Sequence, residues 1–280
     1  MFHFNNQIKI MKTISKWFIF GAFFAAFTLT SCDREQNETI RKQSAQDEIQ
    51  ADGFFDDLVA ETDDIQTLIL EDKSGNNGSK DGSKTYTIVN NPDGSRDITV
   101  TFVNYTNLNF ANAHVKNGIV NIHVMGTPDS TIFTRVITFT NFTIDGNQIL
   151  GTITVTKVSP TVTSIQIANG QIIFTDGTTY TRQGTKTRTQ IDGMVTPSIW
   201  DNVYQVTGTF IGMNRQGLNY SHEVVTPLVR YMSYRYFVSG ILELEVGNRD
   251  VVIDFGDGTL DNLVDITING TTYTDVALTH

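Results

Sequence analysis

From residue 85 to the C-terminus, apolar and polar residues alternate in short runs. Four of these runs have clear apolar positions, and these are Ile98, Val100 and Phe102; Val120, Ile122 and Val124; Leu242, Leu244 and Val246; and Val264, Ile266 and Ile268. A period of two places one face of a strand in a core and the other face in water. The pattern therefore predicts β-strands, roughly a dozen of them.

Short turn signals separate the runs. They are Asp93-Gly94, Asp145-Gly146, Asn169-Gly170, Asp176-Gly177, Asp192-Gly193 and Asn269-Gly270. Such pairs supply the positive φ that tight hairpins need. Because hairpins join strands that are neighbours in the sequence, we expect an all-β domain over residues 85–280. It would be a large antiparallel meander, either a curved sheet or a sandwich. One short internal similarity, between residues 101–106 (TFVNYT) and 138–143 (TFTNFT), suggests only that two strands end in the same way.

A different pattern precedes the strands. Apolar residues recur at intervals of three and four, at Phe54, Phe55, Leu58, Val59, Ile65, Leu68 and Ile69. Acidic residues between them, such as Asp56, Asp57 and Glu61, mostly occupy the other face. This predicts one short amphipathic helix, within an acidic tether over residues 32–72. We interpret its acids as a solvated face on a helix that packs its apolar stripe on the main domain, and not as a metal cluster. Residues 73–84 are rich in Gly, Ser and Asn, which is typical of a flexible linker.

The N-terminus reads as a lipoprotein signal peptide over residues 1–31, with Met11 as the better start. Lys12 and Lys16 precede an uncharged apolar run that is too short to span a bilayer. The run ends in Leu29-Thr30-Ser31-Cys32, which matches a bacterial lipobox. We therefore expect cleavage before Cys32 and lipidation of its sulfur, so that the mature protein is held to a membrane by its lipid.

Composition narrows the function classes. The chain has 280 residues with 20 Lys+Arg against 30 Asp+Glu, a net charge of −10, which argues against a nucleic-acid partner. A single cysteine excludes internal disulfides and Cys-based zinc sites. Sequence motifs of zinc proteases, serine hydrolases and phosphate-binding loops are absent. We therefore expect a protein that is not an enzyme and has no cofactor. His114, His123 and His222 are interpreted as polar-face strand residues.

Several short sequence motifs resemble those of a family of surface lipoproteins of Bacteroidota. They are residues 137–142 (ITFTNF) with Gly146 and Gly151, 204–208 (YQVTG), 238–240 (VSG), 253–262 (IDFGDGTLDN), 268–270 (ING) and, in the helix, 55–58 (FDDL). The resemblance implies an all-β lipoprotein without assigned catalytic residues. In that family a cysteine often stands at each of two positions that are Tyr234 and Leu260 here. The resemblance implies that these cysteines form one disulfide, which this chain would replace by apolar packing.

Two local clusters are candidate sites. Asp254, Asp257 and Asp261 lie in a glycine-rich loop and form a weak candidate for Ca²⁺, but their spacing is not that of an EF-hand. We interpret the loop as a tight turn whose side chains bond their own backbone. Tyr231, Tyr234, Tyr236 and Arg235 form the densest aromatic cluster, which we expect on one strand. With Trp200, these residues are the candidate ligand-binding set. We favour the alternative of a core strand with an arginine whose charged end reaches water, and Trp200 is either a binding anchor or a core residue.

The sequence thus favours a lipid-anchored protein of the outer membrane, exposed at the cell surface, with a non-catalytic binding or structural role. Acidic Asp33, Glu35 and Glu38 directly after the lipid cysteine resemble a surface-export signal of Bacteroidota. The alternatives are a glycan-binding lipoprotein that uses an exposed Tyr/Arg strand, and a hydrolase with an unrecognised site. A glycan or a protein at the cell surface would be the partner.

Overall fold

The computed structural model describes residues 39–65, 82–108, 114–127, 133–196, 198–247 and 250–278. The chain divides into two compact units, residues 1–42 and residues 43–280. Of the first unit only the helical residues 39–42 are described, and the account below concerns the second unit. The expected signal peptide, Cys32 and most of the expected linker lie outside the described residues, as do Leu68 and Ile69 of the expected helix.

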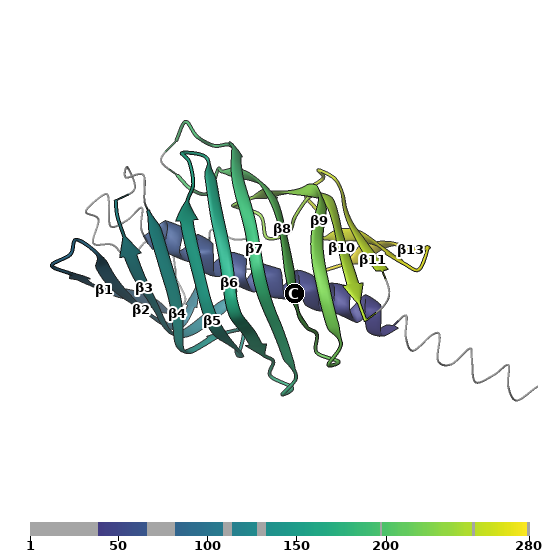
Figure 1. Ribbon diagram of the computed structural model, residues 1–280, viewed down its shortest axis with the longest axis horizontal. Helices are drawn as coiled ribbons and strands as arrows, with labels where there is room; N and C mark the ends of the chain where they lie inside the picture. Colours follow the sequence, from purple (N-terminus) through teal and green to yellow (C-terminus); the bar gives the residue numbers. More distant parts are fainter. Residues whose placement is uncertain are drawn as a thin grey trace, which may run out of the picture. The chain divides into compact units, whose positions relative to one another are not determined.

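Thirteen strands form a single antiparallel sheet in which every strand pairs with its sequence neighbours (Figure 1). The strands are β1 Ser83–Asn90, β2 Arg96–Thr106, β3 Val115–Met125, β4 Thr134–Ile144, β5 Asn147–Lys157, β6 Val162–Ile173, β7 Thr179–Asp192, β8 Val203–Met213, β9 Asn219–Tyr231, β10 Ser239–Val246, β11 Asp250–Asp257, β12 Leu263–Ile268 and β13 Thr271–Ala277. The predicted meander is therefore confirmed, as one curved sheet. It begins at Ser83, within the segment expected to be a linker.

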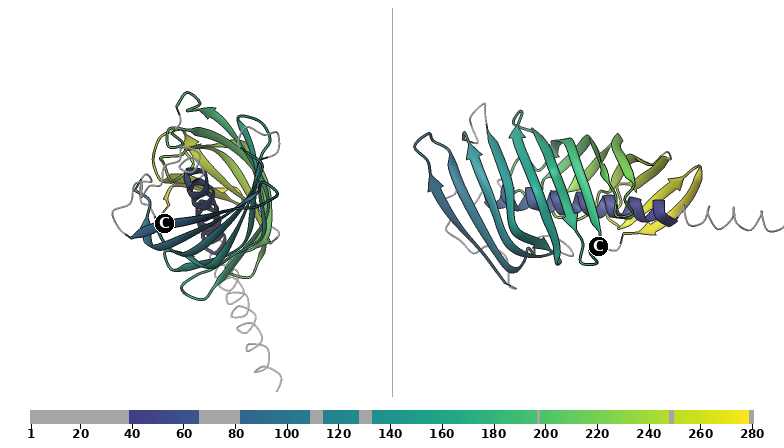
Figure 2. Two further views of the ribbon diagram at one scale, coloured as in Figure 1. Left: turned by 90° about the vertical axis from the view of Figure 1, so that its left-hand side faces the viewer. Right: turned by 60° about the horizontal axis from the view of Figure 1, so that its bottom comes forward.

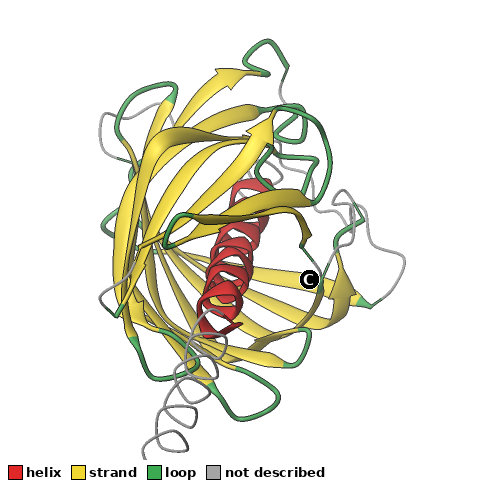
Figure 3. Ribbon diagram, turned by 90° about the vertical axis from the view of Figure 1, so that its right-hand side faces the viewer, coloured by secondary structure: helices red, strands yellow, loops and turns green. Residues whose placement is uncertain are grey.

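The sheet curves around the helix, which runs across the strands on the concave side (Figures 2 and 3). Residues 43–65 contain three alanines, a single glycine and no proline, a composition that permits a helix. Phe54, Phe55, Leu58 and Val59 are at most 1% exposed and belong to the same hydrophobic core as the inward residues of the strands. The helix is thus part of the core of the β unit, and it does not form a separate tether.

Bulges bend the strands. Asn104, Asn141 and Asn169 adopt positive φ values of 47°, 48° and 50°. Shifts in strand register accompany them, for example between Thr138 and Thr143 in the pairing of β4 with β5. A bulge increases local twist and curvature. The similar segments 101–106 and 138–143 contain two of these bends, and Asn104 and Asn141 are their residues with positive φ.

Each bend also needs close approach of the neighbouring strand. Gly118 of β3 has φ +98°, and a Cβ atom there would lie 2.2 Å from the carbonyl oxygen of Asn141. Gly151 of β5, with φ +110°, meets the carbonyl oxygen of Asn169 in the same way, at 2.6 Å. Only glycine fits such positions, so the Asn and Gly residues together set where the sheet folds over the helix.

In the part of the chain that the structure describes, no helix has both the length and the apolar character needed to cross a membrane.

Candidate functional site

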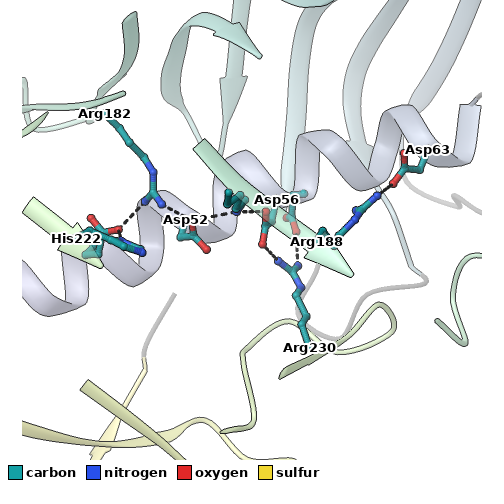
Figure 4. Close-up of polar contacts among 10 residues, drawn as sticks. Asp52, Asp56, Asp63, Arg182, Arg188, His222 and Arg230 are labelled. Atoms are coloured by element: carbon teal, nitrogen blue, oxygen red, sulfur yellow. Dashed lines mark hydrogen bonds and ion pairs between the residues drawn. The ribbon is translucent and has the colours of Figure 1, made fainter. Parts of the chain in front are cut away.

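The concave side of the sheet is lined with cations that face the acidic helix. Residues 43–65 carry eight acidic residues and no lysine or arginine. Arg182 of β7 binds Glu48 at 2.7 Å and Asp52 at 2.5 Å, and its side chain is 0% exposed (Figure 4). Lys186, also on β7, lies 3.1 Å from Asp52. The expectation of a solvated acidic face is therefore wrong, because these carboxylates are buried and paired.

The pairing continues along the whole helix. Arg230 of β9 binds Asp56 at 2.6 Å, and Arg188 of β7 binds Asp63 at 2.6 Å. Further pairs join Asp47 to Arg215, Asp56 to Lys186, Asp57 to Arg230 and His114, Glu61 to Lys84 and Lys116, Asp63 to Arg135, and Asp64 to Lys84. Cations of β1, β3 and β4 thus meet acids of the last helical turn, Glu61 to Asp64, whereas Arg182 of β7 and His222 of β9 meet Glu48 near the other end, which fixes the direction of the helix across the sheet.

Burial and pairing act in opposite directions on these carboxyls. Burial alone would raise the pKa of Glu48, but Arg182 and His222 outweigh it and lower that pKa from 4.5 to about 2. The pKa values of Asp52, Glu61 and Asp63 are also lowered, because facing cations again exceed the cost of burial. These four carboxylates are thus held ionised by the sheet, in a structural role.

Two histidines belong to this interior. His222 of β9 contacts Glu48 through its Nδ1 atom and is 4% exposed. His114, directly before β3, contacts Asp145 and lies 3.8 Å from Asp57. Their interpretation as polar-face residues is wrong, whereas His123 does lie half-exposed on its strand and bonds Asp97 at 2.7 Å.

The Tyr/Arg cluster does not form a strand. β9 ends at Tyr231, and residues 232–238 make an irregular connection to β10. Tyr236 is 8% exposed, and its ring meets that of Tyr234 edge to face with centroids 6.1 Å apart. Arg235 contacts His114. Only Tyr231 is well exposed, at 38%, so these residues do not offer an open aromatic strip.

Trp200 lies before β8, partly buried against the hydrophobic core. It is away from the Tyr/Arg connection in the sequence. Trp200 has the surroundings of a core residue.

The aspartates of the glycine-rich loop bond their own backbone. Asp254 accepts a hydrogen bond from the Gly256 amide at 2.9 Å, and Asp257 accepts one from the Thr259 amide at 3.1 Å. Asp261 accepts one from Leu263 at 3.0 Å. This is the tight-turn geometry expected from the sequence. Among the described residues there is no group of three or more His, Cys, Asp or Glu side chains placed to hold a metal ion.

The convex side of β4–β8 has the opposite character to the concave side. Its outward residues are Thr134, Val136 and Thr138 of β4; Thr152, Thr154 and Thr156 of β5; Ser164, Gln166 and Ala168 of β6; Thr181, Gln183, Thr185, Thr187 and Thr189 of β7; and Gln205, Thr207, Thr209, Ile211 and Met213 of β8. We call these nineteen residues the threonine face. None of them is buried and none is charged.

Strand register aligns these side chains in rows. Thr134, Thr156, Ser164, Thr187 and Thr207 are successive cross-strand partners, so five neighbouring strands present a hydroxyl in one line. A second row runs beside it through Thr154, Gln166, Thr185 and Thr209. Single strands do not reveal this face, because the rows appear only when neighbouring strands are aligned by their register. The run Thr185-Lys-Thr-Arg-Thr189 carried the signal.

Two adjoining recesses lie at one end of the threonine face. The first, of about 400 Å³, is bordered by Gln166, Ala168, Gln183 and Thr209. The second, of about 760 Å³, extends from Gln183 over Thr181 and Met213 to Asn219. Gly184 and Gly212 line the recesses through their backbone, since a Cβ atom there would point to the concave side, toward Phe210 and Tyr220. Carboxylates do not line either recess.

Carboxylates gather in a smaller recess of about 140 Å³ on β9–β11. Glu223, Glu243, Glu245 and Asp250 border it. It has about a fifth of the volume of the larger recess beside the threonine face, so it offers little room for a substrate.

Comparison of the chain with protein-family models, with curated proteins and with solved structures yields no match.

Proposed function

We propose that this protein is a lipid-anchored binding protein of the bacterial cell surface with no catalytic activity. Acid–base catalysis would need carboxylates, lysines, arginines or histidines. In the interior of this protein, such groups instead pair with one another and hold the helix in the sheet. The observation that carries the proposal is this division between an interior of buried ion pairs and an uncharged polar face of which no residue is buried. Such a face is available for contact with a partner, whereas the paired groups are not.

Membrane attachment is proposed from the sequence. The lipobox at Cys32 follows an uncharged apolar run, and Asp33, Glu35 and Glu38 follow the cysteine. This arrangement supports lipidation and export to the outer surface in a bacterium of the Bacteroidota, to whose surface lipoproteins the chain is similar in its motifs. Residues between Cys32 and the folded unit would then hold the sheet beside the membrane.

Detergent partitioning of cells that express the full chain tests the anchor. Wild-type protein should enter the detergent phase, and Cys32→Ser should enter the aqueous phase because it loses acyl chains worth ~0.8 kcal/mol per buried CH₂. Ser31→Ala is the matched control, since it keeps a small residue beside the cysteine, and it should behave like wild type. Wild-type protein in the aqueous phase, with an N-terminus other than Cys32, would overturn the anchor.

Protease added to intact cells tests surface exposure. The protein should be cut without lysis, and a periplasmic marker should stay intact. Digestion that begins only after the cells are broken would show that the protein faces inward.

A hydrolase is the second candidate, and the acidic recess of β9–β11 is what favours it. Its carboxylates would have to supply the acid and base. Glu243→Gln should then abolish hydrolysis of a bound glycan, and unchanged glycan after prolonged incubation with wild-type protein would exclude this candidate.

A further inference from the structure

The threonine face repeats hydrogen-bonding groups at the spacing of the sheet. Neighbouring strands lie ~4.8 Å apart, so the hydroxyls of Thr156, Ser164 and Thr187 follow one another at about that interval. One pyranose ring adds a similar length to an extended glycan chain. A polysaccharide that crosses the strands could therefore meet one hydroxyl or amide side chain per sugar.

The recesses add directional groups beside this row. Gln183 borders both hollows, and Gln166 faces it across the first. A side-chain amide donates and accepts, as a sugar hydroxyl does, so the two can pair in either sense. The backbone at Gly184 and Gly212 also lines these recesses, between the outward side chains of their neighbours Gln183, Thr185, Ile211 and Met213.

Charge excludes ionic ligands from this surface. The cations of the same strands, Arg135, Arg182 and Lys186, are at most 4% exposed. Arg182 is among the residues that line the second recess, but its guanidinium is bound to Glu48 and Asp52 on the concave side. A phosphate, sulfate or uronate would find no cation among the outward side chains of the threonine face. Charged residues stand at its borders, with His123 beside Val136 and Glu223 beside Thr209. The threonine face is therefore an uncharged region with charged residues at its edges, and its uncharged side chains suit a neutral ligand.

Composition also argues against a protein or an apolar partner. The centres of protein interfaces are enriched in aromatic residues and arginine, and the threonine face has neither. Its apolar members are few, with Ile211 at 53% and Met213 at 39% exposure beside each other at one end. They suit contact with the C–H face of a sugar better than burial of a hydrophobic chain.

We propose that the threonine face binds a neutral polysaccharide, with the chain lying across β4–β8 and one segment seated over Gln166 and Gln183. This inference rests on the proposed surface-binding function and names its ligand class. It also relocates glycan binding from the Tyr/Arg connection to the convex side of the sheet.

Affinity electrophoresis of the full lipidated chain in non-ionic detergent tests the proposal. The native gels contain dextran, starch, mannan or galactan as neutral probes, and alginate or heparin as anionic probes. At least one neutral polymer should retard the wild-type protein, and the anionic polymers should not.

Three variants locate the site. Thr185→Lys places a charge in the middle of the second row, and Gln183→Ala removes the amide shared by both recesses; each should weaken retardation about tenfold. Thr185→Ser keeps the hydroxyl and should bind like wild type. Thr274→Lys, on the exposed surface of β13, is the matched control for the added charge and should also bind like wild type.

The outcomes are distinct. Failure of every neutral polymer to retard the wild-type chain would overturn the proposal, as would equal retardation of wild type and Thr185→Lys. Equal loss in Thr274→Lys would show a general charge effect and would overturn it too. Because partitioning and surface proteolysis do not depend on the ligand, a negative gel with a positive Cys32 result would reject the polysaccharide and leave the anchored surface protein standing.

Discussion

At the scale of single residues, the protein places charges where strands usually place apolar side chains. In β7, Arg182, Lys186 and Arg188 point toward the helix, while the threonines between them point outward. Arg182 also stacks on Phe210, with its guanidinium carbon 3.7 Å from the ring centroid. A buried ion pair is weak evidence for added stability, but removal of one partner leaves a buried charge uncompensated and is costly.

Glu48→Gln should therefore destabilise the protein by about 3–5 kcal/mol, because Arg182 and His222 would lose their buried anionic partner. Urea unfolding at neutral pH measures this. Glu223→Gln is the matched control, since Glu223 follows His222 on β9 but is exposed on the outer side. Its effect should be within about 0.5 kcal/mol. Similar losses in the two variants would contradict the structural role given to Glu48.

At the scale of elements, the shape of the sheet depends on a few bends. Thirteen strands in a plain twisted sheet would leave the helix exposed on one side, and the Asn–Gly pairs instead fold the sheet over it. Asn141 and Gly118 form one such pair between β4 and β3. The helix and the bends are thus interdependent, because the ionic pairs form only where the sheet is curved.

Gly118→Ala should cost more than about 2 kcal/mol, since its φ of +98° is strained for alanine and the new Cβ would lie 2.2 Å from the Asn141 carbonyl oxygen. Gly94→Ala provides the control. Gly94 has φ +85° but no atom within 4 Å of a built Cβ, so it should lose only about 1 kcal/mol. Thermal or urea unfolding gives both values, and an equal loss would mean that the close approach of β3 and β4 is unimportant.

At the scale of the whole molecule, acid should loosen the helix from the sheet. The pKa values of Glu48, Asp52, Glu61 and Asp63 are lower in the folded protein than their ordinary values, so folding is favoured above the unfolded-state pKa and this stability is lost as pH falls. Burial raises the pKa of Asp47 and Asp64, which act in the opposite direction but are fewer.

We expect the free energy of unfolding to decrease between about pH 4.5 and about pH 2, with Glu48 alone contributing about 3 kcal/mol. Urea unfolding across that range is the measurement. The Glu48→Gln variant should show a shallower dependence, since the titrating group is absent. A free energy that stays constant between about pH 5 and about pH 3 would contradict the role of these pairs.

The sequence by itself determined the strands, their order and the helix. Period-two alternation and turn pairs such as Asp145-Gly146 are local properties, and strands joined by hairpins pair with their neighbours whatever the rest of the chain does. The apolar stripe that includes Phe54, Phe55 and Leu58 predicted the helix in the same way. The aspartate loop was also local, because Asp254 and Asp257 bond amides two residues away.

Only the tertiary structure decided which side of β7 is inside. The alternation of Arg182, Lys186 and Arg188 with threonines fits a charged outer face equally well, and water is the usual environment of a charge. The acidic helix instead directs the charged side of β7 inward, since eight carboxylates in one segment of the core require cations from the sheet. Those partners are 20 or more residues apart in the chain, as with Lys84 and Asp64, and more than 130 apart for Glu48 and Arg182. Because the cations face inward, the threonines face outward. The proposed binding surface is therefore a consequence of contacts that no local pattern contains.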